Sequence, residues 1–276
     1  MIEILSNLSD KQAVVEAIEG NAAELLLAMG HAGGGEEVHK PHITWTIGGS
    51  PIDYHNAVVH ADLSRTALTA DAVIMEVIEQ FRTRGVPGTW HVGPSFRPAN
   101  LGELLVEHGF HDAGGEPGMA ADLNTLNEDI QYPSHLVIER VREDRQLDVW
   151  GETLAEGFGE GEREANWVQD ISRKIGLGDD VPYRHYLGWL DGKAVATASL
   201  FLGAGAAGIY FVMTVPEARR QGIGAAITLA ALREAQQMGY RVGVLGSSEP
   251  GYPVYKRIGF QEYCQIGIYE WHLNGE

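Results

Sequence analysis

The residues best suited to chemistry form a short run of arginines and glycines, Pro216-Glu217-Ala218-Arg219-Arg220-Gln221-Gly222-Ile223-Gly224-Ala225-Ala226. The run lies between an apolar stretch typical of a strand and a stretch with the spacing of an amphipathic helix. Glycines let the backbone approach a ligand closely, and a helix N-terminus offers unpaired N–H groups and a partial positive charge. Together with the two arginines, the run predicts a site for a phosphate-like anion. A tight turn with solvated arginines is the alternative interpretation.

Two common nucleotide-binding motifs fit this run less well. A nucleotide P-loop ends in Gly-Lys-Ser/Thr, and a dinucleotide-binding turn carries three spaced glycines with an acidic residue about 20 positions later. Neither pattern is present around Gly222 and Gly224.

Helix-like and strand-like stretches alternate around the run. Apolar residues recur at helical spacing in residues 8–30, 70–84, 99–108, 145–157, 163–175, 222–238 and 252–257. Strands are expected at residues 43–47, 56–60, 89–92, 118–123, 136–141, 186–190, 195–202, 207–214, 242–245 and 266–273. A glycine-rich loop is expected from His31 to Glu37. This alternation predicts an α/β (α+β) fold with a sheet of mixed strand direction.

The two halves of the chain echo each other. In each half a helix ends at a glycine, Gly85 or Gly239, and a strand, a short helix and a Gly-Phe pair follow. These pairs are Gly109-Phe110 and Gly259-Phe260. A duplicated fold is the simplest explanation.

A polar stretch with a proline, residues 127–134, is the best linker candidate between the halves. We therefore expect two domains, at residues 1–130 and 135–276. In the alignment of the halves, the counterpart of the Arg219–Gly224 run is residues 65–70, which contain no glycine. The first domain is expected to lack the anion-binding loop.

Composition excludes several classes of function. The chain has 276 residues, of which 44% are hydrophobic, so it can form sizeable cores. It contains 20 Lys and Arg and 38 Asp and Glu, and the resulting net charge of −18 disfavours binding to nucleic acid or to anionic lipid. Residues 1–132 hold 6 of the basic and 19 of the acidic residues, which favours either a cationic partner or simply a well-solvated surface.

Cysteine, histidine and hydropathy patterns add three expectations. Cys264 is the only cysteine, which excludes an intramolecular disulfide and fits a reducing compartment. Eight of the eleven histidines lie in the first half at spacings that match no metal-ligand template, so no metal site is predicted. The first residues lack the pattern of a signal peptide, and no apolar run has transmembrane length. A soluble, cytoplasmic protein is expected.

Two motifs taken together resemble the GNAT family of N-acetyltransferases. Residues 212–224 contain an Arg/Gln-x-x-Gly-x-Gly/Ala loop, and after a helix and a strand Tyr255-Lys256-Arg257-Ile258-Gly259-Phe260 gives a Tyr-x-x-x-Gly-Phe ending. The resemblance covers residues 135–274, about half of the chain. It implies two GNAT-like domains, each a mixed, mostly antiparallel twisted sheet flanked by helices, with the first domain a degenerate copy.

The resemblance also implies acetyl-CoA as the acetyl donor. In the family, exposed backbone groups of the strand before the loop pair with the pantetheine arm; here these belong to Val212, Met213 and Thr214. The pyrophosphate is implied to lie on the loop formed by Arg219, Arg220, Gln221, Gly222, Ile223, Gly224 and Ala225. An asparagine of the family is replaced by Ser248, whose hydroxyl can donate a hydrogen bond over a shorter reach.

By the same resemblance, Tyr255 is the general acid that returns a proton to the coenzyme A thiolate. Packing beneath Gly259-Phe260 is the alternative role for this side chain. The attacking amine must be neutral, so a base or a water chain must accept its proton. Positions 208–212 and 241–245, where the family often has a glutamate, contain no carboxylate.

Substitutes for the missing base remain open. Tyr210, His185, and Glu160 or Glu162 in the loop at 157–162 are the candidates. The implied function is transfer of acetyl from acetyl-CoA to a primary amine by direct attack, with a cationic small molecule favoured over a protein amino group. The alternatives are a non-catalytic acyl-CoA-binding or partner-binding protein, and a phosphate-binding protein unrelated to coenzyme A.

Overall fold

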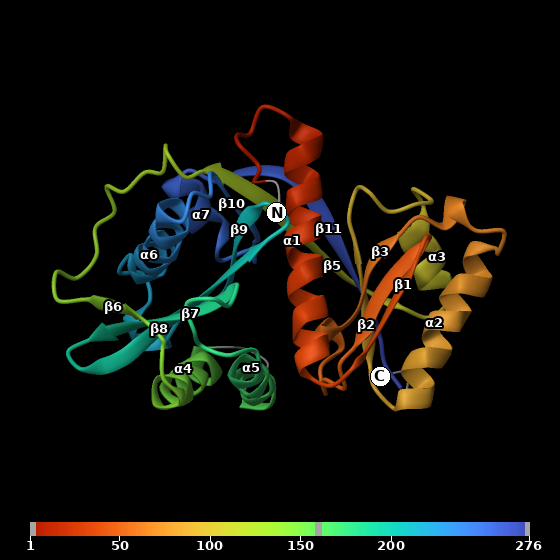
Figure 1. The fold of residues 1–276 in the computed structure, drawn as a ribbon, viewed down its shortest axis with the longest axis horizontal. Coiled ribbons are helices and arrows are strands. Elements are labelled where there is room, and N and C mark those ends of the chain that lie inside the picture. Colours follow the sequence, from red (N-terminus) through yellow and green to blue (C-terminus); the bar gives the residue numbers. More distant parts are fainter. Residues whose placement is uncertain (1–3, 158–161, 274–276) are drawn as a thin grey trace. The chain divides into compact units, whose positions relative to one another are not determined.

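The computed structural model describes residues 4–157 and 162–273, and it divides into two compact units (Figure 1). Unit 1 comprises Met1–Asn21 and Gly118–Tyr263, and unit 2 comprises Ala22–Pro117 and Cys264–Glu276. Both units combine helices with a sheet of mixed strand direction, as the sequence predicts. None of the described helices has both the length and the apolar character that crossing a membrane requires.

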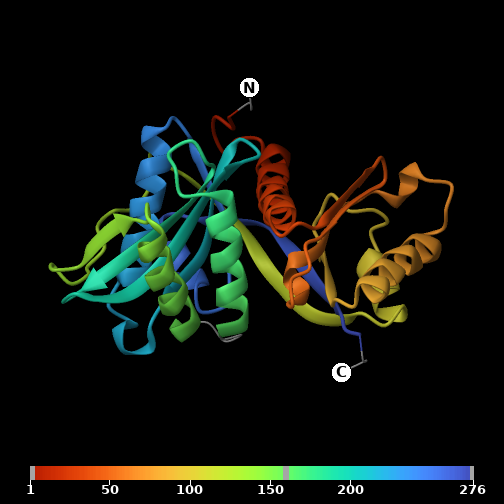
Figure 2. The same cartoon turned by 60° about the horizontal axis from the view of Figure 1, so that its bottom comes forward.

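Unit 1 is a sheet with helices on both faces. In sheet order its strands are β5 (His111–Asp122, from Gly118 on), β10 (Val242–Gly246), β9 (Ala206–Thr214), β8 (Lys193–Gly203), β7 (Tyr183–Leu190) and β6 (Val137–Arg140). Of these neighbouring pairs only β9 and β10 run parallel. Figures 1 and 2 show α4 (Asp144–Gly157) and α5 (Glu162–Ile175) on one face, and α6 (Ile223–Gln237) and α7 (Tyr252–Ile258) on the other.

Unit 2 repeats the parallel-pair arrangement on a smaller scale. Its strands, in sheet order, are β1 (Glu36–Lys40), β2 (Ile43–Ile47), β3 (Asn56–Ala61), β4 (Gly88–Val92) and β11 (Gln261–Trp271, from Cys264 on). The pair β3 and β4 is parallel and the other pairs are antiparallel. Its other described elements are α2 (Ala70–Arg84), α3 (Leu101–Glu107), the later part of α1 (Lys11–Ala32) and the 3-10 turns η1 (Asp53–His55) and η2 (Leu63–Arg65).

The last strand of each half is exchanged. β5 follows α3 in the sequence, yet its residues 118–122 pair with β10 of unit 1. β11 follows α7, yet its residues 267–271 pair with β4 of unit 2. The units therefore differ from the contiguous segments 1–130 and 135–276 that the sequence suggests, because strand pairing between distant segments leaves no local signal.

The expected linker packs onto unit 1 instead of running free. Ile130 is 5% exposed and belongs to the unit 1 core. Asn127 donates a side-chain hydrogen bond to the Arg257 carbonyl over 3.0 Å, and Glu128 pairs with Arg233 on α6. Apolar contact by Ile130 offsets the polar character that makes this stretch look like a linker.

Most predicted elements match the structure, and three differ. Residues 36–40 form β1, where the sequence suggests a loop over 31–37; its charged, outward-facing side chains hide an edge strand. β5 begins at His111, where residue 118 was expected, and β11 begins at Gln261, where 266 was expected. Polar residues at the start of both strands, together with glycines in β5, mask their extended conformation.

A charged network fixes α6 on the unit 1 sheet. One Glu234 oxygen accepts hydrogen bonds from Arg184 at 2.7 Å and Arg140 at 3.1 Å, and the other accepts from the Tyr186 hydroxyl at 2.8 Å. The Arg184 and Arg140 side chains are only 5% and 7% exposed. Without Glu234, two nearly buried cations would lose a counter-charge.

We expect Glu234→Gln to lower the free energy of unfolding by about 2 kcal/mol, because it leaves buried guanidinium groups undercompensated. Glu128→Gln is the matched control, since Glu128 pairs with the neighbouring Arg233 at the surface, where both side chains are about half exposed. That change should cost less than about 0.5 kcal/mol. Urea unfolding of both variants measures the difference, and equal losses would contradict this role of Glu234.

Candidate functional site

A β-bulge interrupts β9 in the middle of unit 1. Met213 pairs with Thr197 and Tyr210 pairs with Ser199, so two residues of β9 stand opposite one residue of β8. Phe211, in the bulge, has a φ of 50°, a left-handed conformation that is unusual for a bulky side chain. The Thr197 hydroxyl donates a 2.9 Å hydrogen bond to the Phe211 carbonyl. This bond stabilises the bulge.

The bulge coincides with the separation of β9 from β10. Their described ladder consists of Ala207 with Gly243 and Gly208 with Val244. Beyond it β10 continues to Gly246 in its pairing with β5, whereas β9 continues to Thr214 along β8. Residues 212–214 of β9 therefore lie beyond the described ladder with β10, and they are partly exposed. An extended ligand can pair there as an added strand.

The arginine-glycine run forms the turn that starts α6. Arg220 and Gly222 both have left-handed φ values, 64° and 79°. The first hydrogen bond of the helix joins the Ala226 N–H to the Gly222 carbonyl. The N–H groups of residues 223–225 come before this bond, so they have no acceptor within the helix. The N-cap residue is Gly222, which has no side chain to cap the helix, and the first turn carries no acidic residue. The turn presents amide donors and positive potential to an anion.

The corresponding helix of unit 2 is already capped. The Thr69 side chain accepts a hydrogen bond from the Ala72 N–H at 3.2 Å, and Asp71 lies in the first turn of α2. A cap and a carboxylate at a helix N-terminus oppose the binding of an anion. The start of α2 is therefore less suited to an anion than the start of α6.

The two glycines of the loop have different surroundings. A Cβ atom at Gly222 would lie 2.1 Å from the Gln131 carbonyl oxygen, so Gly222 is required by packing against the chain itself. A Cβ atom at Gly224 would meet only the Thr214 hydroxyl, at 3.7 Å. The sequence argument assigns close ligand approach to both glycines, but only the side of Gly224 is open to it within the described residues.

The two arginines differ as well. The Arg219 guanidinium donates to the carbonyl of Thr214 at 2.9 Å and to that of Gly157 at 3.3 Å, which ties the loop to the ends of β9 and α4. Arg220 is exposed at the turn. Arg219 therefore shapes the loop, while Arg220 contributes charge at its surface.

The short helix α7 places Tyr255 and Ser248. Tyr255 is 8% exposed, and its ring meets the Phe260 ring edge-on with centroids 5.9 Å apart. The Phe260 N–H donates to the Tyr255 carbonyl, and Gly259 closes the helix at a φ of 114°. The Ser248 hydroxyl accepts from the Gly251 N–H at 3.3 Å. Its own proton stays available for a hydrogen bond to a ligand.

In unit 2, α3 ends with the same geometry. Gly109 has a φ of 88°, and the Phe110 N–H donates to the Leu105 carbonyl. Leu105 thus occupies in unit 2 the position that Tyr255 has in unit 1, so this position carries no phenol in unit 2. The echo seen in the sequence is a structural repeat.

The candidate bases do not form one arrangement. His185 is fully buried, its Nδ1 lies 2.8 Å from the Ser199 hydroxyl, and its ring centroid lies 4.7 Å from that of Trp150. Burial, reinforced by the charge of Arg140, lowers the pKa of His185 to about 3. At neutral pH this ring is uncharged and holds a proton poorly, which argues against a role as base.

The other candidates have different positions. The Tyr210 hydroxyl donates to the Asn21 side-chain oxygen over 2.7 Å. Glu162 is exposed at the start of α5, and Glu160 lies outside the described residues.

Sequence reasoning missed two residues that support the site. Asn21 is fully buried on α1, and its amide donates to the carbonyls of Gly203 at 2.8 Å and Ala206 at 3.1 Å. The signal for Asn21 was available, because an amide on the apolar stripe of a helix needs buried partners. Thr197, which holds the bulge, gave no signal, because a threonine is ordinary in a strand.

Comparisons with known proteins agree with this geometry. Residues 148–260 match the model of the acetyltransferase (GNAT) family. A GCN5-related N-acetyltransferase from Kribbella flavida is similar in structure, with a TM-score of 0.70 and 16% identity over 91% of this chain and 96% of that one. A tandem GNAT protein from the clavulanic acid biosynthesis pathway has a TM-score of 0.59 and 15% identity, over 83% and 77% of the chains.

A further solved structure and the curated proteins complete the comparison. A functionally unknown conserved protein from Staphylococcus epidermidis gives a TM-score of 0.62 and 14% identity, over 86% of this chain and 94% of that one. No curated protein matches the sequence. At these identities the likeness establishes the fold.

The burial of His185 predicts a pH dependence of stability. Between pH 6.5 and about 3 the unfolded chain binds a proton at His185 and the folded chain does not. The free energy of unfolding therefore does not depend on His185 above about pH 6.5, and it decreases as the pH falls below that value. From pH 7.0 to 5.5 the loss should be about 1 kcal/mol. Urea unfolding of the wild type and His185→Gln at both pH values measures it. If the two proteins lose equal stability, His185 is not neutral and buried as described.

Proposed function

We propose that this protein is an acetyl-CoA-dependent N-acetyltransferase with its active site in unit 1, where residues 148–260 match the model of the acetyltransferase (GNAT) family. The observation that carries the proposal is the opening between β9 and β10, next to the uncapped start of α6. One feature suits an extended pantetheine arm, and the other suits a pyrophosphate.

Acetyl-CoA would bind along β9 at residues 212–214, beyond the described ladder with β10. Backbone groups of Val212, Met213 and Thr214 would pair with the amides of the pantetheine arm, as in strand addition. The amides from Arg220 to Ala225 would hold the pyrophosphate, with charge from Arg220 and the loop held in shape by Arg219. The hydroxyl of Ser248 would donate to the cofactor.

Transfer would proceed by direct attack. The neutral amine nitrogen attacks the thioester carbonyl carbon, and collapse of the tetrahedral intermediate breaks the bond between carbon and sulfur. Tyr255 would donate its phenolic proton to the departing thiolate, and the proton that the amine loses would pass to water. We assign no side chain as the base, because His185 is buried and neutral and the Tyr210 proton is donated to Asn21.

The acceptor class follows from charge. The chain carries 38 acidic against 20 basic side chains, and this imbalance favours approach of a cationic ligand at low ionic strength. We therefore propose a small molecule with a primary amine, such as a polyamine or an amino sugar, as the acceptor. A protein amino group is the second possibility.

The loop assignment is tested at Gly224. A side chain at this position meets little of the folded chain, so Gly224→Val should fold normally yet obstruct the pyrophosphate. We expect at least a tenfold weaker Kd for acetyl-CoA, about 1.4 kcal/mol. Gly224→Ala is the control, because the family motif accepts alanine there. Calorimetry measures the Kd of both variants for acetyl-CoA and for ADP. An unchanged affinity of Gly224→Val for acetyl-CoA would show that the cofactor binds elsewhere.

The proposed reaction is tested at Tyr255. With a panel of primary amines, the wild type should release free thiol from acetyl-CoA, and Tyr255→Phe should reduce kcat by about 100-fold with little change in acetyl-CoA affinity. Tyr252→Phe is the matched control, because this tyrosine of the same helix donates to Glu262 at 3.0 Å. Equal turnover in all three proteins would remove the acid role. Binding of acetyl-CoA without thiol release for any amine would indicate a non-catalytic acyl-CoA-binding protein.

A further inference from the structure

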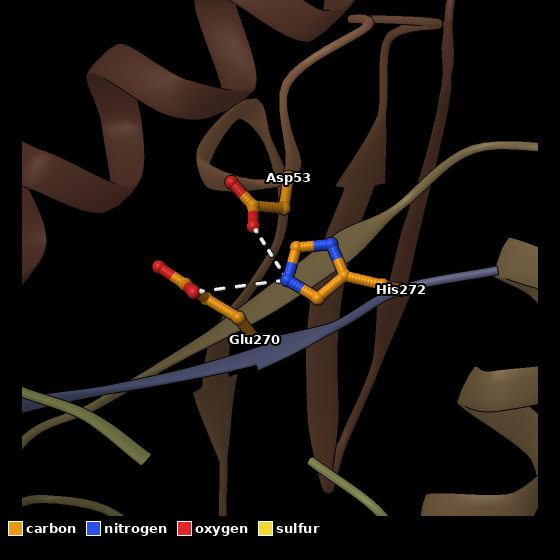
Figure 3. Close-up of side chains that lie close together, drawn as sticks. All are labelled: Asp53, Glu270 and His272. Carbon is orange, nitrogen blue, oxygen red and sulfur yellow. Dashed lines mark ion pairs between the residues drawn. The ribbon is translucent and has the colours of Figure 1, made fainter. Parts of the chain in front are cut away.

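Three side chains able to bind a metal ion converge in unit 2 (Figure 3). Tyr255 and the loop around Gly222 belong to unit 1. They are Asp53, Glu270 and His272. Asp53 begins η1, Glu270 lies near the end of β11, and His272 follows that strand directly. β4 brings the segments together, because η1 packs against β4 and β11 pairs with it, with Glu270 opposite Thr89.

The distances suit an ion better than direct hydrogen bonds. His272 Nε2 lies 3.6 Å from Asp53 Oδ2 and 3.8 Å from Glu270 Oε2, and the three ligand atoms lie within 4.8 Å of one another. Both nitrogen–oxygen distances exceed the usual hydrogen-bond range of about 2.7–3.2 Å. In a tetrahedral zinc site with bonds of about 2.0–2.2 Å, ligand atoms lie about 3.3–3.6 Å apart, so small side-chain movements complete the geometry.

The partial burial of the three side chains and a hydrogen bond to Asp53 also favour a metal ion. The Asp53, Glu270 and His272 side chains are 15%, 28% and 39% exposed, so two carboxylates share a partly buried place beside one imidazole. The three ligand atoms meet at one place, where a single divalent cation can contact all of them. The second Asp53 oxygen accepts the Tyr54 N–H at 2.7 Å, which orients the carboxylate. Figure 3 shows the His272 ring nitrogen directed at both carboxylates.

We propose that Asp53, Glu270 and His272 form a binding site for a divalent transition-metal ion of the zinc class. One imidazole nitrogen and two carboxylate oxygens favour Zn²⁺ over Mg²⁺ or Ca²⁺, which prefer oxygen ligands alone. Three protein ligands leave a fourth position for water. The ion would fasten the end of β11 to η1. The histidine spacing in the sequence gave no sign of this site, because Asp53 is far from Glu270 and His272 along the chain.

The experiment uses the full chain, stripped of metal with a chelator and then titrated with ZnCl₂ by calorimetry. We expect binding of one ion per chain, and with CoCl₂ the visible absorption of four-coordinate cobalt. His272→Gln and Asp53→Asn should each weaken Zn²⁺ binding by at least about 100-fold. The control is His108→Gln, because His108 forms an ordinary ion pair with Asp71 at 2.8 Å in the same unit; its affinity should stay within twofold of the wild type.

Three outcomes would overturn the proposal. They are absence of Zn²⁺ binding to the wild type, retention of full affinity in both ligand variants, and an equal loss in the His108 control. Circular dichroism and thermal unfolding without metal establish that each variant is folded, and Glu270→Gln serves as a third ligand variant if one of the others is not. Acetyl-CoA is absent from these measurements, so their result is independent of the proposed acetyltransfer.

Discussion

The site in unit 1 depends on a conflict between two strand partners of β9. This strand follows β8 along its whole length and also starts a parallel ladder with β10, but the bulge at Phe211 changes its course after the second ladder pair. The left-handed Phe211 costs about 1–2 kcal/mol relative to a regular strand residue. The hydrogen bond from Thr197 to its carbonyl offsets part of that cost. Beyond the bulge, Met213 and Thr214 pair with β8 and lie outside the described ladder with β10.

Comparison of the units shows how one architecture serves two purposes. Each unit has a parallel strand pair, a helix that ends in a left-handed glycine, and a short helix that closes with Gly-Phe. In unit 1 the helix start is uncapped and basic and the short helix carries Tyr255. In unit 2 Thr69 caps the helix, Asp71 makes its start acidic, and Leu105 replaces the tyrosine. The two units thus differ at two corresponding positions, the start of the long helix and a residue of the short helix before the Gly-Phe ending.

The sequence was sufficient where the determinants are local. The helix over 70–84 was predicted with its observed bounds, because its apolar stripe and Gly85 are contiguous signals. The turn around Gly222 and the Gly-Phe ending are likewise set by contiguous residues. The bulge, the exchange of β5 and β11, and the meeting of Asp53 with His272 depend on pairing between distant segments, which periodicity does not encode. His185 shows the opposite error, since its residue type suggested a base, whereas its burial makes it a neutral core residue.

The strand exchange gives the first half of the chain a structural role in unit 1. Residues 118–122 of β5 supply the antiparallel neighbour of β10, and Met119 and Ala121 are buried in the unit 1 core together with Leu245 and Phe260. A chain that began after β5 would leave the hydrogen-bonding edge of β10 and this apolar surface uncovered, and both are unfavourable in water. β10 in turn forms one side of the opening beside β9. The first half therefore contributes to unit 1, because one of its strands stabilises the sheet that carries β9 and β10.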